Sequence, residues 1–94
     1  MRLIVEVIDI KGNCPVYKIG NTFSLIDGYK LKSEKPICMH SLASFLPIYN
    51  ALSKGIKPKD LGLGEGEKAY FQCLDPYLRT GGGTVIFSVY KQDE

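Results

Sequence analysis

Residues 2–10 carry apolar side chains on both faces of an extended chain, and this pattern limits the fold more than any other feature. One face of such a strand would hold Leu3, Val5 and Val7, and the other would hold Ile4, Ile8 and Ile10. Two apolar faces are typical of a strand inside a sheet, covered on both sides or covered on one side by a partner. We therefore expect residues 2–10 to form a central strand.

Turn signals divide the rest of the chain into further elements. Asp27-Gly28 would end a second strand over residues 22–26, and the polar, basic residues 29–38 would form an extended return segment. Two later strands are predicted over residues 68–74 and 84–90, because alternate residues there are apolar. The residues expected to face the core are Ala69, Phe71 and Cys73 in the first of these strands, and Val85, Phe87 and Val89 in the second.

Apolar residues at three- and four-residue spacing predict one helix within residues 40–54. The stripe consists of Leu42, Phe45, Leu46, Tyr49 and Leu52. Ser41 would cap the start of the helix by accepting a bond from a backbone N–H, and Gly55 would cap its end in a left-handed conformation. Pro47 lacks a backbone N–H, so we expect it either to kink the helix or to be the first residue of a helix that begins there.

The order β-β-α-β-β predicts an α+β domain, with a four-stranded, mostly antiparallel sheet and one main helix on one face. Residues 1–94 are of ordinary size for a single domain. Gly81, Gly82 and Gly83 would form a flexible connection between the last two strands. A chain this short leaves little room for a deep pocket, so a functional site would be a shallow cleft, a strand edge or a dimer interface.

Net charge and hydropathy limit the partners and the cellular environment that we expect for this protein. A formal net charge of +2 does not favour nucleic acid as a partner. No apolar run approaches the ~20 residues that span a bilayer, so no membrane partner is expected. Glu6 and Asp9 interrupt the first apolar stretch, which is therefore not typical of a signal peptide. We expect a cytoplasmic protein with reduced thiols, and the odd number of cysteines also argues against a disulfide framework.

Three separated cysteines, Cys14, Cys38 and Cys73, are the chemically suggestive feature of the chain. If the last strand pairs antiparallel with both the first and the third, the strand ends that carry Cys14 and Cys73 fall on the same edge of the sheet. The extended segment 29–38 could span about 33 Å at ~3.3 Å for each residue, which is enough to return Cys38 to that edge. We therefore expect the three thiols to converge.

Several chemistries fit such a convergence. With His40, two residues after Cys38, the thiols form a Cys₃His set suited to zinc. Three thiolates alone would hold an iron–sulfur cluster with one iron left open. The close C-x-x-C pairs that mark strong metal motifs are absent from the sequence.

Two other hypotheses stay open beside metal or cluster binding. Free cysteines are often small buried hydrophobic residues, and the protein would then be an interaction module, acting as a homodimer or with a protein partner. Alternatively, Cys38 lies just before a helix N-terminus, which favours a reactive thiol and a thiol-based redox protein. Asp75, which precedes Pro76, is interpreted as a turn residue.

Five segments carry a resemblance to a known family. They are Lys11-Gly12-Asn13-Cys14-Pro15, Lys18-Ile19-Gly20-Asn21-Thr22-Phe23, Ile37-Cys38, Leu46-Pro47-Ile48-Tyr49-Asn50-Ala51-Leu52 and Cys73-Leu74-Asp75-Pro76. Together they resemble a family of small prokaryotic proteins with a Gly-x-Cys-Pro motif and two further cysteines. The resemblance implies that the thiols matter, which favours a metal or cluster. It implies no catalytic residue, since no activity is established for the family, and Val16-Tyr17 replaces the Gly-His that tends to follow the first Cys-Pro there.

Overall fold

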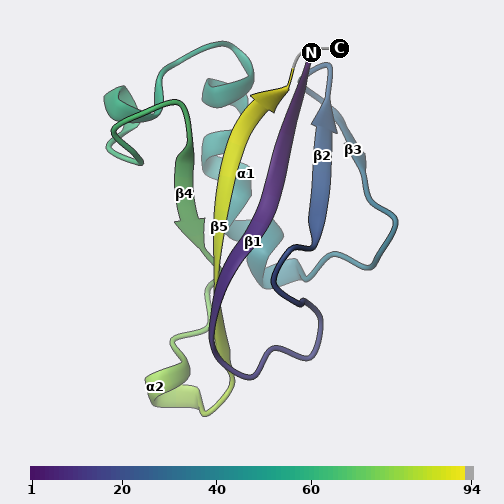
Figure 1. Cartoon of the computed structure of the whole chain (residues 1–94), viewed down its shortest axis with the longest axis vertical. Helices are drawn as coiled ribbons and strands as arrows, with labels where there is room; N and C mark the ends of the chain where they lie inside the picture. The colour runs from purple at the N-terminus through teal and green to yellow at the C-terminus, as the bar shows by residue number, and fades with distance from the viewer. Residues whose placement is uncertain (93–94) are drawn as a thin grey trace.

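The computed structural model describes residues 1–92 and contains a five-stranded antiparallel sheet with one main helix on one face (Figure 1). The elements are β1 (Arg2–Gly12), β2 (Thr22–Ile26), β3 (Lys30–Lys32), α1 (Met39–Ser53), the 3-10 turn η1 (Pro58–Leu61), β4 (Ala69–Gln72), α2 (Tyr77–Thr80) and β5 (Gly83–Gln92). The strand order is β3-β2-β1-β5-β4. The expectation that residues 2–10 form a central strand is confirmed.

The predicted number and order of elements were wrong, because the segment 29–38 contains β3. Asp27 and Gly28 have φ values of 55° and 84°, as both central residues of a type I′ turn require. The Tyr29 N–H donates to the Ile26 carbonyl oxygen at 3.3 Å and closes this turn. The chain therefore reverses at once, and Lys30–Lys32 pairs with β2 instead of running freely back across the molecule.

A bulge in β1 changes which residues face the core. Val7 pairs with Phe87, but the next pair joins Asp9 to Ile86, so Ile8 is an extra residue. After the bulge Ile10 pairs with Val85 and packs against the core. The prediction that Ile10 shares a face with Ile4 and Ile8 was wrong, because it assumed unbroken alternation.

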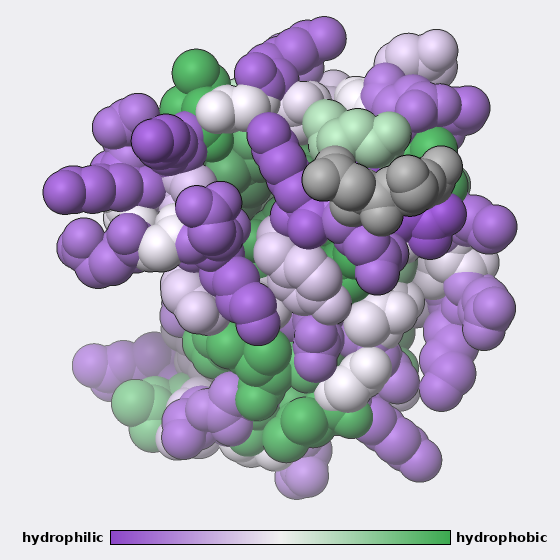
Figure 2. Space-filling model, turned by 45° about the horizontal axis from the view of Figure 1, so that its top comes forward, coloured by the Kyte–Doolittle hydropathy of each residue, from purple (hydrophilic) through white to green (hydrophobic). Residues whose placement is uncertain are grey.

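The core lies between the sheet and α1, and aromatic rings fill it. Phe71 and Phe87, on the adjacent strands β4 and β5, stack with their ring centroids 4.7 Å apart, and Phe71 also stacks on Phe45 of α1 at 5.5 Å. Ala69, Cys73, Val85, Phe87 and Val89 are all buried, as predicted. Within residues 1–92, the main helix α1 lies on this face of the sheet only (Figure 1). In Figure 2 most of the visible surface is hydrophilic, and hydrophobic side chains gather below the centre.

Helix α1 is continuous through Pro47, so a helix that begins at this residue is excluded. Cys38 is the N-cap residue and makes no side-chain cap, so the expected Ser41 cap was wrong. Gly55, with φ of 92°, takes the predicted left-handed conformation after the helix. Of the predicted apolar stripe, Leu46 is 54% exposed, which means that one part of the helix has no cover within the described chain.

Candidate functional site

A cavity of about 210 Å³ brings together the three cysteines from distant parts of the sequence. Cys14 follows β1, Cys38 precedes α1, and Cys73 follows β4. The Cys73 side chain is buried, and the Cys14 and Cys38 side chains are half-buried. The other residues that line the cavity are Pro15, Val16, Tyr17, His40, Asp75, Gly83 and Val85.

The strand order produces this arrangement. β5 pairs antiparallel with both β1 and β4, so the C-terminal ends of β1 and β4 lie at the same end of the sheet as the start of β5 (Figure 1). The predicted pairing that was to bring Cys14 and Cys73 together is thus confirmed. Residues 33–38 then lead from β3 to the start of α1, which places Cys38 at the same cavity.

The Cys14 sulfur is surrounded by backbone donors. Its Sγ accepts hydrogen bonds from the N–H groups of Val16, at 3.4 Å, and Tyr17, at 3.3 Å. Pro15 suits this tight turn because its ring fixes φ and it needs no partner for an N–H. Backbone N–H groups aimed at a sulfur are also among the features that tune metal-bound thiolates.

The Cys73 sulfur is bonded to the first residues of β5. Its Sγ accepts the Val85 N–H at 3.3 Å and donates to the Gly83 carbonyl oxygen at 3.6 Å. The Cys73 N–H donates to the Val85 carbonyl oxygen at 3.0 Å, which continues the β4–β5 pairing past the end of β4. Cys73 is therefore the most firmly held of the three thiols.

Tyr17 joins the Cys14 turn to the start of α1. Its hydroxyl accepts the Cys38 N–H at 2.9 Å and lies 2.7 Å from Ser41 Oγ. Ser41 Oγ donates to the Cys38 carbonyl oxygen at 2.8 Å, so the phenol is the donor to Ser41. Tyr17 is only 6% exposed and packs edge-on against Phe87.

The same burial affects the ionisation of Tyr17. Burial is the largest cause that raises the pKa of this phenol, and charge on the nearby Cys38 and Cys14 raises it further, while the bonds with Ser41 and Cys38 oppose the rise. The phenol therefore stays protonated and keeps its donor bond at ordinary pH. Nothing in the sequence distinguishes Tyr17 from the other tyrosines, so this residue was missed.

Glycines allow the two segments beside the cavity to approach closely. A Cβ atom at Gly83 would lie 2.5 Å from the Asn13 carbonyl oxygen. The Asn13 N–H donates to the Gly82 carbonyl oxygen at 3.1 Å. Gly81 ends α2 with φ of 75°, and Gly83 is buried at the start of β5. Gly83 thus belongs to β5 and not to the predicted connection, and these glycines permit close packing and a left-handed cap.

The two remaining polar side chains have different roles. His40 lies in the first turn of α1, exposed at the rim of the cavity. The Asp75 carboxylate accepts hydrogen bonds from the Thr80 hydroxyl and, at 3.2 Å, from the Gly83 N–H. Asp75 therefore holds the turn between β4 and β5, as predicted, and its carboxylate is already bonded there.

The described residues include no group of three His, Cys, Asp or Glu side chains placed to bind one metal ion together. The thiols of Cys14, Cys38 and Cys73 thus line the cavity without meeting at a single point. One zinc ion would need every sulfur at about 2.3 Å. The thiolates of an iron–sulfur cluster instead bind different irons.

Comparisons of the chain with family models, with curated proteins and with solved structures found no match. Within residues 1–92, no helix combines the length and apolar character that crossing a membrane requires.

Proposed function

We propose that this protein binds an iron–sulfur cluster, or another thiophilic metal centre, through Cys14, Cys38 and Cys73. The proposal rests on one observation, that thiols from three separate segments line one cavity of about 210 Å³. Thiolates are the usual ligands of iron–sulfur clusters, and three of them leave one metal position open. His40, at the rim, is the side chain available as a further ligand.

The local structure supports a bound thiolate at Cys14, and at Cys73 a metal would replace the thiol proton that Sγ donates to the Gly83 carbonyl oxygen. Backbone N–H groups point at the sulfur atoms of Cys14 and Cys73, which is how proteins stabilise and tune such ligands. Tyr17 holds Cys38 in place through the peptide N–H rather than through the sulfur, so the Cys38 thiol stays available. The Cys14 and Cys38 side chains are half-buried, which leaves a route for a metal to enter.

We also propose that the protein works in the cytoplasm and belongs to the family with the Gly-x-Cys-Pro motif. All three cysteines are free thiols, which fits a reducing compartment. The family resembled by the sequence carries cysteines at the same three points, and the cavity supplies a physical reason for that pattern.

The test is a metal and sulfide analysis of protein purified without oxygen, together with its absorbance spectrum. A cluster predicts stoichiometric iron and acid-labile sulfide and a visible charge-transfer band. The variants Cys14→Ser and Cys38→Ser should lose the band, whereas Ser44→Ala, a polar change on α1 outside the cavity lining, should keep it. His40→Ala should also keep it if three thiolates are sufficient.

Two results would contradict the cluster. Protein that takes up neither iron nor sulfide during anaerobic reconstitution has no such site. Stoichiometric zinc whose binding depends on His40 would replace the cluster with a Cys₃His zinc site.

A further inference from the structure

The β3 edge of the sheet is open to another strand. β3 is last in the strand order and, within residues 1–92, pairs only with β2. At the opposite edge the Tyr70 N–H of β4 donates to the Leu63 carbonyl oxygen at 2.8 Å, so a loop already occupies part of that edge. An edge strand exposes backbone donors and acceptors that a second extended chain can use.

On the side facing α1, β3 borders an apolar groove of about 190 Å³. Leu31 of β3 and Leu46 of α1 line this groove and are 43% and 54% exposed. The other residues that line the groove are Leu25, Tyr29, Leu42, Phe45 and Tyr49. Because side chains alternate along a strand, every second residue of an added strand would lie against this apolar surface.

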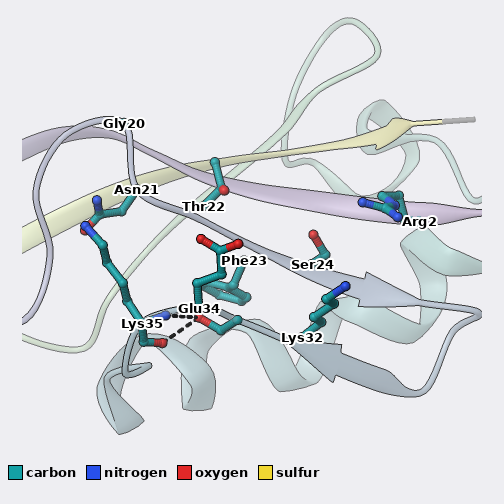
Figure 3. A pocket seen from close by; sticks show the side chains of 10 residues that line it. Arg2, Gly20, Asn21, Thr22, Phe23, Ser24, Lys32, Glu34 and Lys35 are labelled. Atoms are coloured by element: carbon teal, nitrogen blue, oxygen red, sulfur yellow. Dashed lines mark hydrogen bonds between the residues drawn. The ribbon is translucent and has the colours of Figure 1, made fainter.

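On the side facing away from α1, β3 borders a polar cavity of about 390 Å³ (Figure 3). Lys32 and Lys35 line it with Arg2 of β1, and Glu34 is the one carboxylate among its lining residues. Ser24 and Lys32 form a cross-strand pair and point to the same side of the β2–β3 hairpin (Figure 3). The remaining side chains of an added strand would lie on this mainly basic side.

From these two sides we infer that β3 is a docking edge for an extended segment of a partner protein in which apolar and acidic residues alternate. Backbone hydrogen bonds to β3 supply affinity in such a complex, and the alternating side chains supply specificity. The residues on both sides of β3 are different from those that line the cysteine cavity, so this surface is independent of the proposed metal centre.

A second copy of the chain is a poorer occupant of the same edge. Antiparallel β3–β3 pairing centred on Leu31 would place Lys30 of each copy opposite Lys32 of the other. Like charges directly opposite one another destabilise a strand pair. Lys30 already forms an ion pair with Asp27 at 3.1 Å, so Lys32 and Lys35 are the lysines that an acidic partner would contact.

The test uses the whole, isotope-labelled protein and a short synthetic peptide in which glutamate and leucine alternate. Peptide binding should shift the amide resonances of Lys30–Lys32 and slow their hydrogen exchange.

The double variant Lys32→Glu, Lys35→Glu should weaken binding about tenfold, because several attractive charge pairs become repulsive. Leu46→Asp should weaken it as well, through the groove. Lys57→Glu, Lys59→Glu is the matched control, since it changes the net charge equally at exposed positions outside both sides of β3.

Other results would overturn the docking edge. Equal weakening by the control pair, or equal binding of a peptide with lysine in place of glutamate, would reduce the effect to unspecific charge or apolar attraction. Amide resonance shifts at β4 or at the cysteine cavity would show that the peptide binds there and not at β3. If the protein without peptide were a dimer whose β3 amides are already protected from hydrogen exchange, a second copy would be the occupant of this edge. If no peptide bound at millimolar concentration, β3 would not be a docking edge. Lys35 lies outside every strand, so Lys35→Glu alone repeats the test if the double variant fails to fold.

Discussion

The backbone N–H of Cys38 donates a hydrogen bond of 2.9 Å to the hydroxyl of Tyr17, a residue 21 positions earlier in the chain. This bond attaches the start of α1 to the turn that follows β1. Because the same hydroxyl also bonds Ser41 Oγ at 2.7 Å, one phenol fixes the relative position of two walls of the cysteine cavity.

Tyr17→Phe removes only the oxygen of this phenol. The Cys38 N–H then loses its acceptor and Ser41 loses its donor in a buried region, which costs about 1–3 kcal/mol of the free energy of unfolding. Urea denaturation measures the change. Tyr29→Phe is the control, because Tyr29 is 79% exposed and should be neutral. Equal stability of Y17F and the wild type would show that the network does not stabilise the fold.

Gly83→Ala places a methyl group where the Asn13 carbonyl oxygen stands 2.5 Å away. The segment that leads to Cys14 has to move, and we expect a loss of about 1–3 kcal/mol of stability, as in other overpacked sites. Gly66→Ala meets nothing within 4 Å and should leave the melting temperature unchanged. If both variants melted at the wild-type temperature, the close approach of residues 12–14 to β5 would be refuted.

Replacement by alanine should lower the free energy of unfolding at one buried serine, Ser41, and not at another, Ser88. Ser41 is hydrogen-bonded to Tyr17 and to the Cys38 carbonyl oxygen, so Ser41→Ala should destabilise the protein by about 1–3 kcal/mol. Ser88 Oγ is buried without a hydrogen-bond partner among the described residues. Ser88→Ala should therefore be neutral or stabilising, since a buried hydroxyl without a partner carries an uncompensated desolvation cost. Chemical denaturation of the two variants side by side decides this, and a clear loss of stability in S88A would contradict it.

Stability should fall in alkaline solution. Burial raises the pKa of Tyr17 above its ordinary value of 10.0, so above that pH the folded state holds a proton that the unfolded state has released. The contribution of this proton to the free energy of unfolding is fully present below pH 10.0, and it is lost as the pH rises through the raised pKa of Tyr17. The free energy of unfolding of Tyr17→Phe should consequently depend less on pH in this range than that of the wild type. Identical alkaline profiles would contradict the raised pKa.

The elements that could be predicted are those in which alternation of apolar residues is complete. β5 is an example, since Val85, Phe87 and Val89 all face the core. β3 escaped prediction because its single apolar residue, Leu31, lies between two lysines, and its existence depends on the turn at Asp27-Gly28. The bulge at Ile8 escaped because it follows from pairing with β5, which no local pattern encodes.

The candidate site also combines features that could be predicted from the sequence with features that could not. The approach of Cys14 to Cys73 could be predicted, because it depends only on which strands pair. The bonds of Tyr17 could not, since they join two loops whose paths are set by tertiary packing. Gly83 was misinterpreted for a related reason, as the sequence shows that a glycine permits unusual backbone but not that a neighbouring carbonyl requires one.

The extra residue Ile8 in β1 has a consequence for how this chain tolerates change in length. Side chains alternate along a strand, and the bulge resets that alternation, so that Ile10 points to the helix side, towards the face that carries Cys73. Without Ile8, the residues Val7, Asp9 and Ile10 would follow one another opposite Phe87, Ile86 and Val85, so the pairing would be regular and the end of β1 would keep its present faces. Substitutions at Ile8, which is 39% exposed, change only its chemistry. At this position β1 accommodates an added residue without turning the Cys14 loop to the other face of the sheet.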